Sequence, residues 1–258
     1  MIARATTLPS ITYIGEMIAV IDIYAIHQAR DFIYSQLAHA LQTDLLRVYN
    51  ENAQQKYSLS PASIGERLLR NQALSYLMYV EGEGALLAKA QYQSADNMTD
   101  QMAAFKSLTH HETASTDEVI DAFYVQWHQD NLVMDKWFTV QATIPLKSAI
   151  ARVERLFEHR DFDIKNPNRV RSLLGDFCSA NPLCFHDISG YGYRLLGQYI
   201  ETIDAMNPQI ASRLCVPLTR WRRFNETRQE LMRTELQRLI SLPKLSSDVT
   251  ELVEKSLK

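Results

Sequence analysis

Glycine and proline are scarce in this sequence, with eight residues of each in a chain of 258. That is about 3% of each, whereas globular proteins average roughly 7% glycine and 5% proline. β-Sandwiches, barrels and Rossmann-like folds need turn residues every ten or so positions. The shortage therefore argues against those folds and favours long helices joined by short connections.

Cysteine is also rare, and the three present, Cys178, Cys184 and Cys215, lack the spacing of a metal site or a disulfide framework. Apolar residues surround each of them, as in Leu-Cys-Phe at 183–185. This setting predicts reduced thiols packed in a core, which are typical of a cytoplasmic protein. We therefore expect a cytoplasmic location.

Long apolar runs and an excess of basic charge are both missing. The net charge is −3, so the chain as a whole has no positive field to attract nucleic acid or anionic lipid. No apolar run approaches the ~18 residues of a membrane span, and the first residues, MIARATTLPS, lack the apolar segment of a signal peptide. We expect neither a nucleic acid nor a membrane as partner.

Helical periodicity is present along almost the whole chain. Apolar residues recur at spacings of three and four from about Asp22 to Asn50, which predicts one unusually long helix. Ser60-Pro61 is a typical start for the next helix, and Gly82 and Gly84 mark its end. Helices of ~12–20 residues with short links indicate an all-α chain of stacked antiparallel pairs.

Three Asn-Pro pairs, at positions 166, 181 and 207, punctuate the C-terminal half. Asparagine followed by proline at the first helical position is a start signal, because asparagine caps the helix and proline needs no hydrogen-bonded N–H there. Two of these pairs predict helices over 168–180 and 209–221.

Sequence motifs for catalysis are also missing. His110-His111-Glu112 starts like the zinc motif H-E-x-x-H, but position 115 is serine, so no second ligand follows one turn later. The reversed motif, H-x-x-E-H, would need a histidine at position 155 before Glu158-His159, but that residue is arginine. No G-x-S-x-G elbow, P-loop or G-x-G-x-x-G occurs. We expect no metal ligand, no cofactor and no catalytic residue in this chain, and a self-contained hydrolase is the least favoured hypothesis.

Two basic clusters follow two of the Asn-Pro pairs. Lys165, Arg169 and Arg171 lie around the first, and the second is followed by further arginines at positions 213, 220, 222 and 223. A solvated helix face explains most such clusters. Arginines near helix starts can also bind carboxylates with two parallel hydrogen bonds. Spacing leaves both interpretations open for Arg171 and Arg213.

Five strings in the same order resemble one family: DNMTD (96–100), WHQDNLVMDKWF (127–138), NPNRVRSLLGDF (166–177), SGYGY (189–193) and NPQIASRL (207–214). They are similar to the C-terminal domain of bacterial aminopeptidase N, the zinc metallo-aminopeptidase or alanyl aminopeptidase family. The resemblance runs from about Leu8 to Lys258. It implies a right-handed α-solenoid of armadillo or HEAT-like helix pairs, a single domain over residues 1–258, with the catalytic domain absent.

The resemblance also implies a role without bond cleavage. In the family this domain closes over the catalytic domain, which is its expected partner, and the two enclose a cavity that admits peptide substrates. By position, Arg171, Arg213 and Gln209 would line that cavity and hold polar groups of the peptide away from its amino end. Zinc belongs to the catalytic domain, so the chain alone is expected to be inactive.

An independent interaction scaffold is the alternative hypothesis from another class. A solenoid has a concave groove that can bind an unrelated protein. Such a scaffold should begin with a polar, capped helix, whereas Ile11, Ile14 and Met17 make the start of this chain rather apolar. The resemblance therefore carries the main hypothesis, a substrate-gating and cavity-lining domain.

Overall fold

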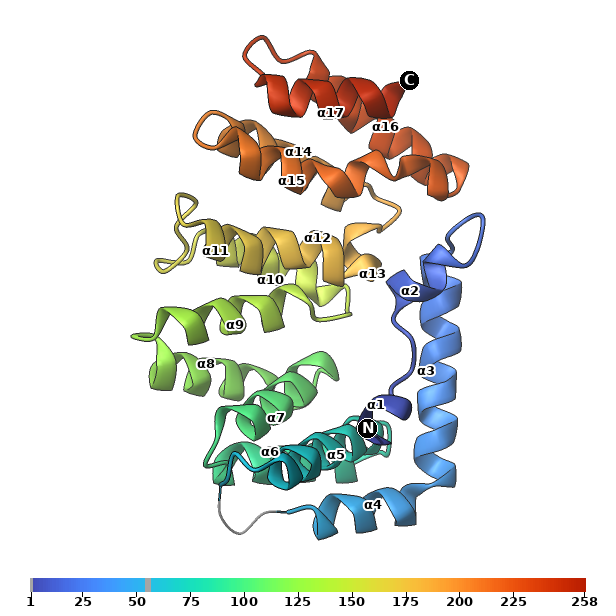
Figure 1. Cartoon of the computed structure of the whole chain (residues 1–258), viewed down its shortest axis with the longest axis vertical. Coiled ribbons are helices and arrows are strands. Elements are labelled where there is room, and N and C mark those ends of the chain that lie inside the picture. Colours follow the sequence, from blue (N-terminus) through green and yellow to red (C-terminus); the bar gives the residue numbers. More distant parts are fainter. Residues whose placement is uncertain (1, 54–56) are drawn as a thin grey trace. The chain divides into compact units, whose positions relative to one another are not determined.

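The computed structural model describes residues 2–53 and 57–258, and their regular structure is helical throughout, with no strand in these ranges (Figure 1). This confirms the all-α prediction. None of the helices in the same ranges combines the length and hydropathy needed to cross a membrane. The chain divides into two compact units: Met1–Ser10 with His27–Trp127, and Ile11–Ile26 with His128–Lys258. The expectation of a single domain over 1–258 stays a prediction.

The first unit consists of helices packed on their neighbours in sequence. Helix α4 packs against α5, α6 against α7, and α5 also contacts α7. This pairing is that of an α-solenoid, in which each helix covers the apolar face of the next. The elements are α1 (Ile2–Ala5), α3 (Ile23–Ala40, in this unit from His27), α4 (Gln42–Glu51), α5 (Pro61–Leu77), α6 (Glu83–Ser94), α7 (Met98–His110) and α8 (Thr116–Trp127).

A polar cap starts α5 where the sequence predicts it. The Ser60 hydroxyl accepts a hydrogen bond from the backbone N–H of Ser63 (3.2 Å), directly before Pro61. Gly82, at a φ of 76°, then begins the turn into α6, a conformation that favours glycine. The predicted start at Ser60 is therefore confirmed, whereas the predicted end at Gly82 is wrong: α5 ends at Leu77, and Gly82 directly precedes α6.

The single helix predicted from Asp22 to Asn50 is two helices in the structure. Helix α3 ends at Ala40 and α4 begins at Gln42, and Figure 1 shows α4 leaving the end of α3 at a steep angle. No glycine or proline lies at the break, so the sequence has no signal for it. The turn brings Leu45 against the buried cluster of Ala38, Tyr76 and Val80. Packing of the second half against α5 therefore overrides helical continuity.

The second unit has the same kind of architecture. Helix α14 packs against α15, and α15 and α16 both pack against α17. Its elements are α2 (Ile11–Glu16), α9 (Asn131–Ala142), α10 (Ser148–Phe157), α11 (Pro167–Val170), the π-helical turn η1 (Arg171–Gly175), α12 (Asp176–Ala180), α13 (Pro182–Phe185), α14 (Tyr191–Asp204), α15 (Pro208–Thr219), the 3-10 turn η2 (Trp221–Arg223), α16 (Glu226–Ile240) and α17 (Ser247–Leu257).

The core of the second unit is made of large apolar side chains and the three thiols. Phe138, Phe177, Phe185 and Tyr193 are fully buried, and the phenyl ring of Phe185 meets the rings of Phe177 and Tyr193 edge to face. All three cysteines are free and buried, as predicted from their apolar neighbours. Burial raises the pKa of the Cys184 thiol to about 11, which keeps it protonated and unreactive at neutral pH.

Candidate functional site

Two of the predicted site residues come from helices that begin at Asn-Pro pairs. The Asn166 side chain accepts hydrogen bonds from the backbone N–H groups of Asn168 (3.0 Å) and Arg169 (3.4 Å). The Asn207 side chain accepts one from Ile210 (3.2 Å). These caps fix the first turns of α11 and α15, and with them the positions of Arg171 and Arg213.

The cap on α11 leads to a testable prediction of stability. Replacing Asn166 by alanine removes the acceptor for two N–H groups, so the free energy of unfolding should fall by about 1 kcal/mol. Aspartate caps helices as well as asparagine does, so Asn166→Asp should stay within a few tenths of a kcal/mol of the wild type. Urea unfolding followed by circular dichroism compares the two variants. An equal loss in both would show that the side-chain acceptor does not stabilise this helix start.

Arg171 opens a π-helical turn where the sequence predicts a continuous α-helix over 168–180. The backbone N–H of Asp176 bonds to the carbonyl of Arg171, five residues earlier. A π turn brings residues five apart into line along the helix. Asp176 thus falls on the same side as Arg171, which α-helical spacing does not predict.

Arg171 and Arg213 line one pocket with a volume of about 320 Å³, which we call the arginine pocket. One wall is formed by α11, η1 and α12, and the other by α15. The lining residues are Pro167, Val170, Arg171, Gly175, Asp176, Cys178, Ser179, Ile210, Arg213, Leu214 and Pro217. Gln209, the third predicted residue, is exposed on the first turn of α15 and is not part of this lining.

The two guanidinium groups keep most of their hydrogen-bonding capacity. Arg171 donates to the Oδ1 atom of Asn168 across 3.3 Å. The side chains of Arg171 and Arg213 are both exposed. Among the residues that the structure describes, Arg213 has no hydrogen bond or ion pair to its side chain. Each arginine can therefore accept a planar anion such as a carboxylate with two parallel bonds.

Asp176 is the one acidic group in the arginine pocket. Burial raises the pKa of its carboxyl, while a hydrogen bond from the Thr139 hydroxyl (2.6 Å) and the charge of Arg171 act in the opposite direction. The lining thus holds one carboxyl group and two guanidinium groups, which leaves the pocket with net positive charge. The pocket can therefore bind an anionic group, and it also offers Asp176 as an acceptor.

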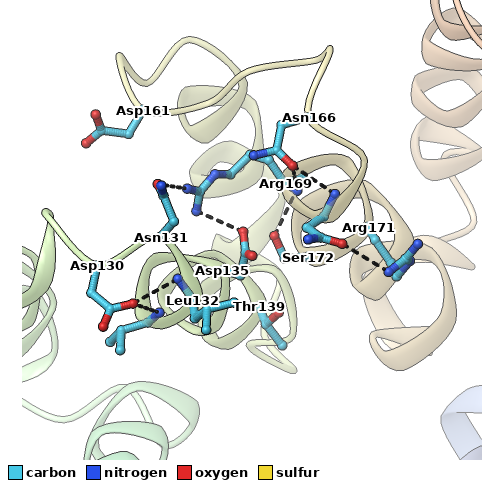
Figure 2. Close-up of polar contacts among 12 residues, drawn as sticks. Asp130, Asn131, Leu132, Asp135, Thr139, Asp161, Asn166, Arg169, Arg171 and Ser172 are labelled. Atoms are coloured by element: carbon cyan, nitrogen blue, oxygen red, sulfur yellow. Dashed lines mark hydrogen bonds and ion pairs between the residues drawn. The ribbon is translucent and has the colours of Figure 1, made fainter.

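The other arginines of the two basic clusters serve the fold. Arg169 is 4% exposed, and its Nη1 atom lies 3.0 Å from the Oδ1 atom of Asp135, as Figure 2 shows. Its guanidinium also stacks over the Phe138 ring, 4.9 Å from the ring centre. Spacing in the sequence could not separate this buried arginine from Arg171, because the two are only two positions apart.

The arginines after α15 are likewise engaged in structural contacts. Arg220 and Arg223 both pair with Glu16 of α2. Arg222 donates to the backbone carbonyl of Ser256 (2.6 Å) and stacks on the Trp221 ring. Arg171 and Arg213 are thus the arginines of the two clusters that line the arginine pocket.

The described residues contain no group of three or more His, Cys, Asp or Glu side chains arranged to hold a metal ion. His111, from the incomplete zinc motif, is partly buried, and this burial lowers its pKa. Its ring packs edge to face against Tyr79 at 4.9 Å. The side chains that the structure describes therefore do not fit a zinc site.

These observations define a protein of stacked helix pairs with a cationic pocket in its second unit. Over residues 1–258 the chain matches the family model described as a domain of unknown function with ARM repeats, DUF3458_C, and it belongs to that family. It is 40% identical over 256 residues to aminopeptidase N of Escherichia coli (strain K12), covering 99% of this chain and 29% of the relative. It is 39% identical over 251 residues to aminopeptidase N of Haemophilus influenzae, covering 97% and 29%.

A solved structure has the same fold. The crystal structure of Legionella pneumophila aminopeptidase A in complex with aspartic acid superimposes with a TM-score of 0.91 at 30% identity, covering 99% of this chain and 31% of that one. The chain thus spans less than a third of the length of these relatives and corresponds to the C-terminal part of aminopeptidase N. The family predicted from the sequence strings is confirmed.

Proposed function

We propose that this chain is the substrate-gating and cavity-lining domain of a zinc-dependent aminopeptidase N, which removes N-terminal residues from peptides. The observation that carries the proposal is the joint position of Arg171 and Arg213 on one pocket, in a chain homologous to the C-terminal part of aminopeptidase N. Its partners are the catalytic domain and the peptide. The buried thiols agree with a cytoplasmic location.

In this role the two arginines hold the peptide and cleave nothing. Their guanidinium groups would bind carboxylate or carbonyl oxygens far from the amino end, which leaves the amino end to the catalytic domain. Gln209, on the exposed turn before Arg213, would add an amide donor and acceptor next to the same pocket. Zinc would be supplied by the catalytic domain, because the described residues of this chain lack a suitable ligand set.

The test combines the 258-residue chain with a fragment of E. coli aminopeptidase N that lacks the matching C-terminal part. We expect the chain alone to bind no stoichiometric zinc and to hydrolyse no alanyl anilide. Added to the fragment, it should restore peptide hydrolysis. Arg171→Gln and Arg213→Gln should each lower kcat/KM for a peptide by about tenfold, the loss expected for a hydrogen bond to a charged group.

The exposed Arg160→Gln serves as the matched control, since this arginine lies outside the arginine pocket. It should leave the restored activity unchanged. One tightly bound zinc per chain, or alanyl anilide hydrolysis by the chain alone, would contradict the proposal. The proposal would also be contradicted if the Arg171 and Arg213 variants restored activity as well as the wild type does.

An independent interaction scaffold remains the second candidate, favoured by an exposed apolar surface in the first unit. Leu59, Ile64 and Leu68 are exposed before and along the start of α5. The scaffold hypothesis predicts a stoichiometric partner unrelated to aminopeptidases that binds the wild-type chain but not Leu68→Lys. Restored activity with the E. coli fragment would favour the first function instead.

A further inference from the structure

A second pocket adjoins the arginine pocket, and we call it the apolar pocket. Its volume is about 220 Å³, and Cys178, Ser179 and Pro217 line both pockets. The two therefore form one continuous groove between α12 and α15, and Arg171 and Arg213 belong to one end of it. At the other end lie α2 and the residues that follow it, within the same unit.

The lining of the apolar pocket is mostly hydrophobic. It includes the side chains of Ile11, Ile21, Ile23, Val216, Pro217 and Phe224. Two basic residues also line it. Burial, with the nearby charges of Arg228 and Arg220, lowers the pKa of His186 to about 3, so its imidazole is neutral at pH 7. Arg220 pairs with Glu16. This end of the groove thus offers apolar surface and no unpaired charge.

The wall contributed by α2 and the following loop is fixed by backbone contacts. The Nη2 atom of Arg223 donates to the carbonyls of Gly15 (3.0 Å) and Ile18 (2.8 Å). The backbone N–H of Ile21 donates to the Arg223 carbonyl (2.7 Å). A wall held by three hydrogen bonds needs little ordering when a ligand binds, which favours affinity.

Size and charge together indicate what this groove can bind. Pockets for whole ligands typically have volumes of roughly 300–1,000 Å³, so the smaller apolar pocket suits one side chain. Next to it, two arginines favour a carboxylate. Only the last residue of a peptide carries a backbone carboxylate and a side chain on the same carbon atom.

We propose that the groove between α12 and α15 binds the carboxyl-terminal residue of short peptides, with its carboxylate at Arg171 and Arg213 and an apolar side chain in the apolar pocket. This inference rests on the proposed function and adds a preference to it: short peptides that end in a residue such as leucine. Val216 lies on α15, lines the apolar pocket and is 47% exposed. We therefore choose it for the substitution that should abolish the preference for an apolar last residue.

The test measures peptide binding to the 258-residue chain by NMR titration. The probes are N-acetyl-alanyl-leucine, its glycine analogue N-acetyl-alanyl-glycine, and the leucine amide, which lacks the carboxylate. The leucine acid should bind about tenfold or more tightly than either of the others, because each lacks one of the two contacts. Equal affinity for leucine and glycine acids would overturn the inference.

Two variants assign the contacts to the two ends of the groove. Val216→Trp should fill the apolar pocket and bring the leucine acid to within about twofold of the glycine acid. Arg213→Gln should weaken both acids about tenfold and leave the amide unchanged. Leu132→Trp, an equally bulky change at an exposed position of α9 outside both pockets, is the matched control and should alter none of the affinities.

The outcomes separate this inference from the proposed function. If both acids need Arg213 but leucine is not preferred, the apolar pocket is not a subsite, while the role of the arginines stands. If no peptide binds up to about 10 mM, or the amide binds as well as the acid, the carboxylate site fails and with it this inference. Should Val216→Trp fail to fold by circular dichroism, Ser179→Trp, at the junction of the two pockets, replaces it.

Discussion

Asp135→Asn should lower the free energy of unfolding by about 3 kcal/mol or more, because it leaves the charge of Arg169 buried without its partner. The Arg169 side chain is 4% exposed and that of Asp135 is 20% exposed, with 3.0 Å between the paired atoms. Asn131 contacts the same guanidinium at 3.5 Å, too far to replace a carboxylate (Figure 2). Urea unfolding followed by tryptophan fluorescence measures the loss, since Trp137 lies two residues from Asp135.

Two controls separate the buried charge from a general effect of the substitution. Removing both charges at once, with Asp135→Leu and Arg169→Met, should recover most of the stability, because a well-packed apolar pair replaces the ion pair without an orphaned charge. Glu251→Gln breaks an exposed ion pair with Lys255 and should leave the unfolding midpoint nearly unchanged. A double variant as unstable as Asp135→Asn would show that the loss arises from packing around Phe138 instead.

His186 should make the second unit sensitive to acid. Burial lowers the pKa of His186 from its ordinary 6.5 to about 3 in the folded protein. Below pH 6.5 the unfolded chain takes up a proton that the folded chain does not, so stability is lost as the pH falls and the loss is complete near pH 3. At about 1.4 kcal/mol for each unit of pKa, the total loss is on the order of 5 kcal/mol.

Comparison with His186→Gln isolates this contribution from that of the carboxyl groups. Glutamine can keep a hydrogen bond to the Tyr193 hydroxyl, which lies 2.8 Å from the His186 Nδ1 atom, but it does not titrate. Urea unfolding at several pH values between 7 and 4 should give a shallower loss for this variant than for the wild type. The exposed His39→Gln should follow the wild type. Parallel curves for His186→Gln and the wild type would contradict the expected burial of a neutral imidazole.

Helix starts were predictable because their signals are local. Ser60 and Asn166 cap helices where the sequence places them, since a capping side chain bonds only to N–H groups two or three residues away. The break near Leu41 was not predictable, because it depends on the packing of Leu45 against residues of another helix. The π turn at Arg171 also lacks a local signal.

The candidate site was predictable in part. Similarity to family strings selected Arg171 and Arg213, and the structure places both on one pocket, whereas Gln209 is not among the residues that line it. The apolar pocket next to it could not have been predicted, because its walls combine Ile21 with residues such as Phe224, some two hundred positions later. The spacing of residues along the chain does not predict which residues so far apart in sequence line the same pocket.

By itself, the sequence determined the helical class, the positions of most helix starts and the family, because periodicity, capping and ordered strings are all properties of neighbouring residues. Only the tertiary structure decided which arginine is buried beside Asp135 and which lines a pocket. Arg169 and Arg171 are two positions apart and chemically identical. A helix turns by about 200° between them, so one faces the core and the other faces the groove.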